Sequence, residues 1–248
     1  MQALGIIPAR YASTRFPGKP LAVLAAKPMI QWVYERAQQC ADLSEVLVAT
    51  DDERIVQAVE AFGGKAVWTS PDHANGTERI AAVAEGFPEY DVVVNIQGDE
   101  PLVEPSVLGD LVATFAEPRV DIATAVRRIE RQEALFNPNV VKVVLDAHQR
   151  ALYFSRSTIP YLRNVPQEQW LAHGLHYQHL GLYAYRRDVL LQLARLPVAE
   201  LERQESLEQL RWLAAGYTMY CIETDYISLG VDVPEDVAKV EPLLRQLG

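Results

Sequence analysis

The stretch DVVVNI, residues 91–96, is the run on which the predicted fold depends. Its β-branched side chains favour a strand, and because nearly every position is apolar, both faces of that strand should be buried. Strands buried on both faces are typical of parallel sheets that are covered by helices on each side. The stretch therefore predicts an α/β protein.

The sequence before and after this strand alternates between short apolar runs and amphipathic runs. Asp51-Asp52 should cap a helix that ends at Gly63-Gly64. The other predicted strands are 4–7, 45–50 and 65–68, and the other predicted helices are 28–40, 77–85 and 105–115. Such alternation predicts right-handed βαβ units and a Rossmann-like, three-layer α/β/α domain with a mostly parallel sheet.

After about residue 120 the pattern changes, because strands follow one another with little helix between them. The predicted elements are strands at 122–128, 140–145, 151–155 and 180–185, a hairpin turn at 146–150, a helix at 205–215, two short strands, and a closing helix from Pro234. The stretch 159–178 lacks periodicity and reads as a loop-rich insertion. We therefore expect a single domain, 1–248, with a mixed-sheet lobe inserted in its second half.

The composition limits the classes of function. The 248 residues carry 33 acidic and 23 basic side chains, a net charge of −10, which argues against a general nucleic-acid binder. Two cysteines, Cys40 and Cys221, cannot form a disulfide framework or a four-ligand zinc site, and a reducing cytoplasm fits them best. No apolar stretch reaches the roughly 20 residues of a membrane span. A small polyanion held in one local basic site remains compatible with this composition.

Positive charge gathers near the start of the chain, in IIPARYASTRFPGKPL, residues 6–21. Arg10, Arg15 and Lys19 all precede the first acidic residue, Glu35, and follow a predicted strand at its ligand-prone carboxyl end. Gly18 would let backbone amides approach an anion, and Ser13-Thr14 adds hydroxyl donors. The stretch is neither a Walker A motif nor a dinucleotide fingerprint. We favour an anion site over the alternative, a solvated basic loop.

Two carboxylates follow predicted strands further along the chain. Asp99 lies in NIQGDEP, residues 95–101, and Asp232 lies in GVDVPED, residues 230–236. Carboxylates at such places can hold Mg²⁺ against phosphate oxygens. The alternatives are a turn aspartate at 99 and a helix cap at 232, since Pro234 begins a helix.

The opening motif resembles that of the sugar-activating cytidylyltransferases: IIPAR at 6–10, STR at 13–15 and PGKPL at 17–21. The spelling RYASTR, residues 10–15, is similar to the branch that activates 3-deoxy-manno-octulosonate (KDO) for lipopolysaccharide biosynthesis. The resemblance implies a nucleotide-diphospho-sugar-transferase-like fold with a nucleotide-binding half, 1–120, and a sugar-binding and dimerisation half, 121–248. It implies transfer of CMP from CTP to the anomeric hydroxyl of KDO, with Mg²⁺, by a cytoplasmic homodimer.

The resemblance also implies roles for individual residues. The implied catalytic residues are Arg10, Lys19 and Asp99, and the implied metal ligands are Asp99 and Asp232. The implied nucleotide-binding residues are Ala9, Arg10, Ser13, Arg15, Lys19, Asn75, Gly76, Arg79 and Gln97. The implied sugar-binding residues are Gln97, Arg156, His179, Tyr183, Glu208 and Gln209, of which Arg156 would clamp the sugar carboxylate.

Several alternatives stay open at this point. Asn75-Gly76 could be only a turn that leads into Thr77 as a helix cap. His173, His176 and His179 suggest zinc, but no cysteine lies nearby and the stretch is not helix-periodic. The alternative substrates are 8-amino-KDO and sialic acid, and the alternative class is a nucleotide-sensing module without turnover.

Overall fold

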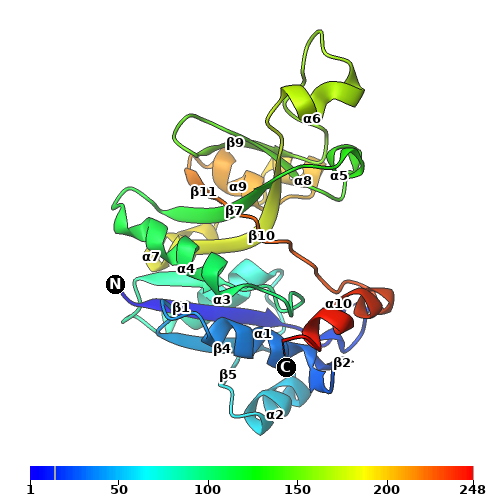
Figure 1. Cartoon of the computed structure of the whole chain (residues 1–248). Helices are drawn as coiled ribbons and strands as arrows, with labels where there is room; N and C mark the ends of the chain where they lie inside the picture. Colours follow the sequence, from blue (N-terminus) through cyan, green and yellow to red (C-terminus); the bar gives the residue numbers. More distant parts are fainter. Residues whose placement is uncertain (14, 248) are drawn as a thin grey trace.

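The computed structural model describes residues 1–13 and 15–247 (Figure 1). Within these residues a single mixed sheet of nine strands organises the molecule, and its main path runs β11-β7-β10-β6-β1-β4-β5. The other two strands, β8 and β9, extend from β10 as a hairpin.

The first half of the chain forms the parallel part of the sheet, as predicted. Its strands are β1 (Ala3–Ala9), β4 (Glu45–Thr50), β5 (Ala66–Trp68) and β6 (Val92–Asn95). β1 lies between β4 and β6 and is parallel to both, so the carboxyl ends of β1 and β6 lie side by side. All four β6 residues are buried, which confirms the expectation from their apolar sequence.

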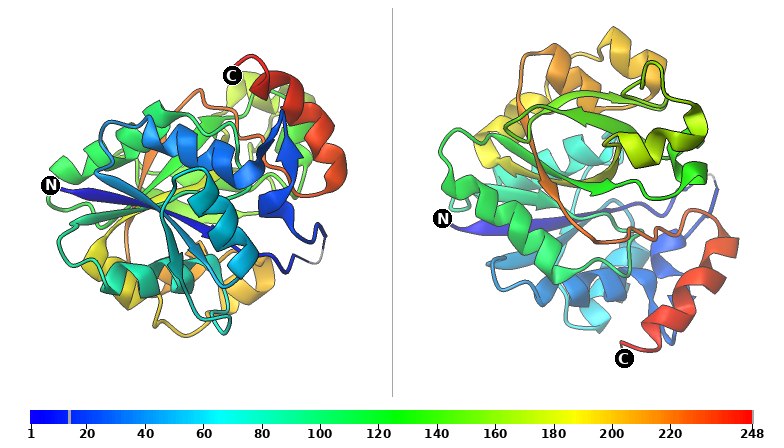
Figure 2. Two further views of the ribbon diagram at one scale, coloured as in Figure 1. Left: turned by 90° about the horizontal axis from the view of Figure 1, so that it is seen from below. Right: turned by 45° about the horizontal axis from the view of Figure 1, so that its top comes forward.

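Helices cover both faces of this sheet, as the two views of Figure 2 show. One face packs against α1 (Met29–Gln38), α2 (Glu53–Ala61) and α4 (Pro105–Ala113). The other packs against α3 (Gly76–Glu85), α7 (Arg187–Leu193) and α9 (Gln209–Ala214). Successive β1 residues alternate between the two cores, with Ile6 in one and Ile7 in the other. This is the predicted three-layer α/β/α arrangement.

The second half adds the mixed part of the sheet. Its strands are β7 (Ile122–Arg128), β8 (Lys142–Leu145), β9 (Ala151–Ser155), β10 (Tyr177–Arg186) and β11 (Met219–Glu223). β10 is antiparallel to β6 and to β7, whereas β11 is parallel to β7. The predicted mixed-sheet lobe is therefore continuous with the central sheet through β10. The predicted hairpin turn is confirmed: the Asp146 carboxylate accepts from the amides of His148 and Arg150, at 2.8 and 2.9 Å.

Two predictions for this half were wrong in detail, and one helix was missed. The helix predicted at 205–215 is two helices, α8 (Glu200–Glu205) and α9, because Ser206 between them adopts a left-handed conformation with φ 52°. The two short strands predicted before Pro234 are one, β11, among the described residues. The stretch 159–178 holds a short helix, α6 (Trp170–His173), after the 3-10 turn η3 (Gln167–Gln169), and α7 was not predicted.

Short elements complete the fold and surround the site. They are η1 (Lys19–Leu21), β2 (Val23–Leu24), β3 (Lys27–Pro28), η2 (Thr114–Ala116), α5 (Gln132–Phe136), η4 (Pro234–Asp236) and α10 (Val237–Leu244). The C-terminal α10 returns to the first half and lies beside β2 (Figure 1). None of the helices described is long and apolar enough to cross a membrane.

Candidate active site

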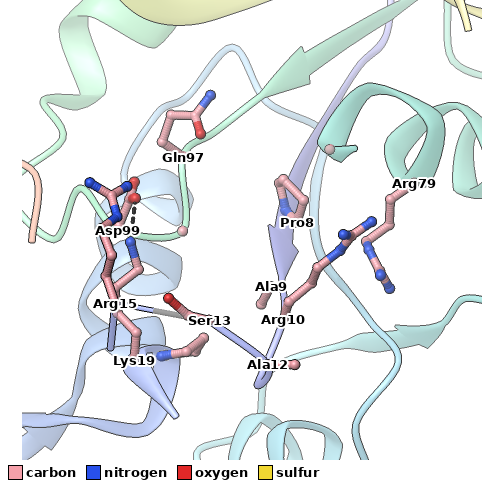
Figure 3. A pocket seen from close by; sticks show the side chains of 13 residues that line it. Pro8, Ala9, Arg10, Ala12, Ser13, Arg15, Lys19, Arg79, Gln97 and Asp99 are labelled. Atoms are coloured by element: carbon pink, nitrogen blue, oxygen red, sulfur yellow. Dashed lines mark hydrogen bonds and ion pairs between the residues drawn. The ribbon is translucent and has the colours of Figure 1, made fainter. Parts of the chain in front are cut away.

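A cavity of about 410 Å³, here called the outer cavity, opens at the carboxyl ends of β1 and β6 (Figure 3). Its walls come from the loop after β1, the start of α3 and the loop after β6. The lining residues are Pro8, Ala9, Arg10, Ala12, Ser13, Arg15, Lys19, Pro20, Gly76, Arg79, Gln97, Gly98 and Asp99. Most of the residues predicted to bind the nucleotide therefore meet here, at the edge where α/β sheets bind ligands.

The basic loop that follows β1 is folded back on itself. The amides of Ser13 and Gly18 both donate to the carbonyl oxygen of Tyr11, at 2.9 Å each. Gly18 has φ +72°, and a Cβ there would lie 3.1 Å from the Tyr11 ring, so this position requires glycine. The Arg54 guanidinium stacks on the Tyr11 ring, 3.3 Å from the ring centre. Thr14, predicted with Ser13 as a hydroxyl donor, lies outside the described residues.

Four charged side chains form a cluster on one side of the outer cavity. Lys19 Nζ lies 2.6 Å from Asp99 Oδ2 and 3.4 Å from Asp232 Oδ1. Arg15 Nη2 lies 3.1 Å from Asp232 Oδ1. Figure 3 shows Lys19 and Arg15 converging on the Asp99 side of the cavity. The structure thus brings together two carboxylates that are far apart in the sequence.

The two carboxylates fit a divalent cation. A single ammonium group, that of Lys19, contacts both Asp99 and Asp232, so a cation at this place meets both carboxylates at once. Mg²⁺ in nucleotide sites is usually held by one or two carboxylates together with substrate phosphates. Within residues 1–13 and 15–247 no group of three or more His, Cys, Asp or Glu side chains could hold a metal. Asp99 and Asp232 are thus a candidate pair of ligands for a metal that is also held by substrate phosphates.

Arg10 and Arg79 form the opposite wall (Figure 3). The Arg10 guanidinium donates to the backbone oxygen of His73. The fully buried Arg79 donates to the Thr69 hydroxyl and, at 2.7 Å, to Asp51 Oδ2. Burial, together with the charge of Arg79, lowers the pKa of Arg10. Two guanidinium groups on one wall, only one of which is paired directly with a carboxylate, favour a bound anion.

The predicted base-recognition segment begins α3. Asn75 is the N-cap of this helix, and its side-chain oxygen accepts from the Glu78 amide at 2.8 Å. The alternative prediction, in which Thr77 caps the helix, was wrong, because the cap is Asn75, two residues earlier. Gly76 lines the outer cavity, whereas Asn75 does not. In this structure the side chain of Asn75 therefore serves to cap the helix.

A second cavity of about 200 Å³, here called the inner cavity, adjoins the outer one. The two share three wall residues, Pro8, Gly76 and Gln97. The remaining lining residues are Thr77, Asn95, Tyr183, Tyr185, Glu208, Gln209 and Trp212. Four of the six residues predicted to bind the sugar, namely Gln97, Tyr183, Glu208 and Gln209, thus lie around one cavity.

The inner cavity is polar and lacks free positive charge. Thr77 Oγ1 donates to Glu208 Oε2 at 2.8 Å, and Gln97 Nε2 donates to the Gly181 oxygen at 2.8 Å. Burial raises the pKa of Glu208 and raises that of Tyr183 well above its ordinary value. Three buried polar atoms here have no hydrogen-bond partner among the described residues: Asn95 Oδ1, Tyr185 OH and Trp212 Nε1. Sequence reasoning missed Thr77 as a contact of Glu208, although it follows Gly76 directly.

The two other predicted sugar-binding residues lie outside both linings. His179 is bonded to the Thr124 hydroxyl at 3.0 Å, and desolvation lowers its pKa to about 3, so its ring is neutral. It reaches the cavity wall only through the Tyr183 ring, 5.3 Å away. The Arg156 guanidinium donates to three backbone oxygens, those of Glu205, Pro138 and Ser206, at 2.7, 3.1 and 3.3 Å. Its role as a carboxylate clamp stays a prediction.

The histidines that suggested zinc do not converge. His176 stacks on Trp170 with ring centres 6.0 Å apart and bonds to the Pro160 oxygen at 3.1 Å. His173 ends α6 and is exposed, whereas His179 faces Thr124. The described part of the chain thus gives no support to a zinc site at these histidines.

A mixed sheet with cations and carboxylates at the carboxyl ends of its parallel strands, beside a second polar cavity, defines an α/β domain of the nucleotidyltransferase class. The chain belongs to the cytidylyltransferase family, since the family model described as "Cytidylyltransferase" matches residues 4–223.

Curated relatives extend this similarity over the whole chain. The chain is 52% identical to a 3-deoxy-manno-octulosonate cytidylyltransferase of Phocaeicola vulgatus, over 99% of this chain and 98% of the relative. It is 50% identical to a protein of the same description from Myxococcus xanthus, over 100% of this chain and 98% of the relative.

A solved structure supports the same assignment. The fold superposes with a TM-score of 0.92 on CMP:2-keto-3-deoxy-manno-octonic acid synthetase complexed with CTP, at 46% identity and 100% coverage of both chains.

Proposed function

We propose that this protein transfers CMP from CTP to the anomeric hydroxyl of KDO and releases pyrophosphate. The observation that carries the proposal is that a cationic cavity and a polar cavity without cations adjoin across Pro8, Gly76 and Gln97. A nucleoside triphosphate and a hydroxyl-rich sugar need these two environments side by side. Relatives at about half identity over nearly the full length support the choice of KDO over 8-amino-KDO or sialic acid.

The outer cavity receives the nucleotide in this proposal. Phosphoryl-type transfer requires charge neutralisation and in-line positioning more than covalent help. Arg10, Arg15 and Lys19 surround the cavity and stabilise the triphosphate and the leaving pyrophosphate. The backbone at Ala9 and the hydroxyl of Ser13 line the same wall. Gly76 and Arg79 are proposed to face the cytosine, with Arg79 oriented by Asp51. Asn75 would reach the base only by giving up its cap contact with the Glu78 amide.

Asp99 and Asp232 are proposed to hold Mg²⁺. When bound, Mg²⁺ would neutralise charge on the triphosphate and lower the pKa of the attacking hydroxyl. In this proposal the Lys19 ammonium leaves the two carboxylates when CTP binds and contacts a phosphate oxygen instead. It lies 2.6 and 3.4 Å from the two carboxylates, at the edge of the cavity that would hold the phosphates, so a change of side-chain conformation would suffice.

The inner cavity receives the sugar in this proposal. Gln97, Tyr183, Glu208 and Gln209 offer amide, phenol and carboxylate groups to sugar hydroxyls. His179 supports the Tyr183 ring, and Arg156 is the proposed partner of the sugar carboxylate. For that contact Arg156 would have to exchange at least one of its three backbone oxygens for the ligand.

Assembly and location are part of the same proposal. We infer a homodimer, because Tyr161 and Leu175 of the 159–178 stretch are 73% and 55% exposed and suit a contact between copies. A cytoplasmic location agrees with Cys40 and Cys221, which are buried and form no disulfide. Sedimentation at micromolar concentration would test the dimer, and a monomer there would contradict it.

Pyrophosphate release tests the reaction. The wild-type protein with CTP, Mg²⁺ and KDO should release pyrophosphate and form CMP-KDO, and omission of KDO should abolish the release. In a panel of acidic 2-keto sugars, KDO should give the highest kcat/KM, ahead of 8-amino-KDO and sialic acid. CTP binding without release under all of these conditions would contradict an enzyme and favour a nucleotide-sensing module.

A further inference from the structure

Residues 224–233, here called the strap, link β11 to η4 without a helix or strand of their own. The strap runs from the second half of the molecule back to the first, and Figure 1 shows it as the orange to red segment that ends near α10. Asp232, near its end, reaches the charged cluster of the outer cavity. An irregular segment needs fixed points to hold one carboxylate in place, because each unrestrained residue costs conformational entropy when it is ordered.

Glu100 supplies two of these fixed points. It is only 6% exposed and follows Asp99 directly. Its Oε2 accepts from the Tyr226 hydroxyl at 2.8 Å, and its Oε1 accepts from the Ser228 hydroxyl at 2.7 Å. Both hydroxyls belong to the strap, and hydrogen bonds to a carboxylate are the stronger kind. Neither the cavity linings nor the proposed mechanism uses Glu100.

Three more hydrogen bonds and one buried side chain fix the strap around Asp232. The Val231 amide donates to the backbone oxygen of Asp99 at 2.9 Å, and the Val231 side chain is fully buried in the core beneath β2 and α1. Asp236 Oδ2 accepts from the amides of Asp232 and Val233, at 3.1 and 3.2 Å. The Glu100 side chain and the Asp99 backbone thus hold the strap from one short loop.

We propose that Glu100 is a positioning residue that fixes the strap so that Asp232 faces Asp99 across Lys19. This inference rests on the proposed function, in which the two carboxylates hold a divalent cation. The Asp99 side chain faces the cavity and the Glu100 side chain faces the strap, so one loop sets the positions of both carboxylates. Loss of the two hydroxyl contacts would free the strap and widen the distribution of Asp99–Asp232 separations.

A merely structural role predicts a different result. If Glu100 only satisfies two hydroxyls, their removal lowers the melting temperature but leaves the cation affinity of the folded protein unchanged. A positioning role predicts weaker cation binding in the folded protein, while CTP binding without metal stays as it was. Groups that orient metal ligands typically change metal affinity by about 10–100-fold when they are removed.

The test uses the double variant Tyr226→Phe/Ser228→Ala, which keeps Glu100, Asp99 and Asp232. Mn²⁺ is titrated into the protein with saturating CTP, and free Mn²⁺ is followed by its electron paramagnetic resonance signal. We expect the Mn²⁺ Kd to rise about tenfold, the lower end of that range. CTP affinity without metal should stay within about twofold, and amide exchange across 224–233 should be faster. The control is Tyr217→Phe, whose hydroxyl bonds to Gln192 far from the cavities.

The outcomes separate this inference from the proposed function. Equal Mn²⁺ affinity in the wild-type protein and the folded double variant would overturn the positioning role alone. No Mn²⁺ binding by wild-type protein with CTP would overturn the proposed metal role and this inference together. If the double variant does not fold, Ser228→Ala removes one of the two contacts at a partly exposed position. It should raise the Kd by about threefold, and an unchanged Kd there would also overturn the inference.

Discussion

The outer and inner cavities share three wall residues and are built in different ways. The cations of the outer cavity come largely from one loop, residues 10–19, and meet carboxylates from the 95–100 loop and the strap. The inner cavity takes its side chains from β1, from β6 and the loop after it, from α3 and β10, and from α9 with the link before it, and none of them is a cation. Positive charge can thus be concentrated by a short sequence motif, whereas a polar cavity without cations requires side chains that only the tertiary fold brings together.

The largest effect should follow from Asp99→Asn in the outer cavity. The amide keeps the size of the carboxylate but cannot replace its charge toward a divalent cation. We expect kcat/KM to fall by about 10³-fold, which corresponds to about 4 kcal/mol, and the Mg²⁺ response to disappear. Asp188→Asn, at a carboxylate that is 83% exposed, is the control. An active variant with a lower melting temperature would show that Asp99 is only a turn residue.

A slightly smaller effect should follow from Lys19→Ala. Lys19 is one donor among several that face the triphosphate, so its loss should lower kcat/KM by about 10²–10³-fold. Lys65→Ala is the matched control, because Lys65 pairs with Glu45 at the surface. An unchanged rate, measured by pyrophosphate release, would remove Lys19 from the mechanism.

Thr77→Val should separate the two cavities. It removes the hydroxyl that bonds to Glu208 and keeps the shape of the side chain. Without this bond Glu208 is no longer held toward the sugar, and the loss of one hydrogen bond to the ligand, about 0.5–1.5 kcal/mol, should raise the KM for the sugar by about three- to tenfold. The KM for CTP should change little, and Thr77→Ser should restore the sugar KM. Equal losses for both substrates would show that the cavities are not independent.

The smallest effect concerns the stability of the inner cavity. Burial raises the pKa of Glu208 in the folded protein, so its ionisation favours unfolding at pH values above that pKa. Glu208→Gln should therefore melt about 2 °C above the wild-type protein at pH 8, as expected for somewhat less than 1 kcal/mol in a domain of this size. The difference should vanish at pH 4, where the carboxyl is protonated in both states. A difference independent of pH, or equal to that of the exposed Glu89→Gln, would contradict the assignment.

Local sequence patterns predicted the helices and strands whose bounds depend on neighbouring residues alone. β4, β7 and β9 have the predicted bounds, because apolar runs between turn residues leave little choice. The helix at 205–215 was wrong because Ser206 breaks it in a left-handed conformation. The Arg156 guanidinium supports this link by bonding to the Glu205 and Ser206 oxygens. That contact joins segments far apart in the chain, so no local pattern could show it.

In the candidate site, too, the residues set by local sequence could be predicted and those set by tertiary contacts could not. Arg10, Arg15, Lys19 and Asp99 could be predicted as a site because each follows a strand at the ligand-prone edge, and the structure places all four around one cavity. Asp232 could be predicted as a ligand but not as a neighbour of Arg15. The path of the strap depends on Glu100, and nothing in the sequence distinguishes a buried Glu100 from a solvent-exposed one.

Titrations of both ligands into both cavity variants test most directly whether the outer cavity binds CTP and the inner cavity binds KDO. CTP and KDO are each titrated, with Mg²⁺ present, into wild-type protein, Lys19→Ala and Thr77→Val. Lys19→Ala should weaken CTP binding and leave KDO binding to the CTP-saturated protein within about twofold. The reverse is expected for Thr77→Val. Equal loss of both ligands in both variants, or exchanged effects, would contradict the account.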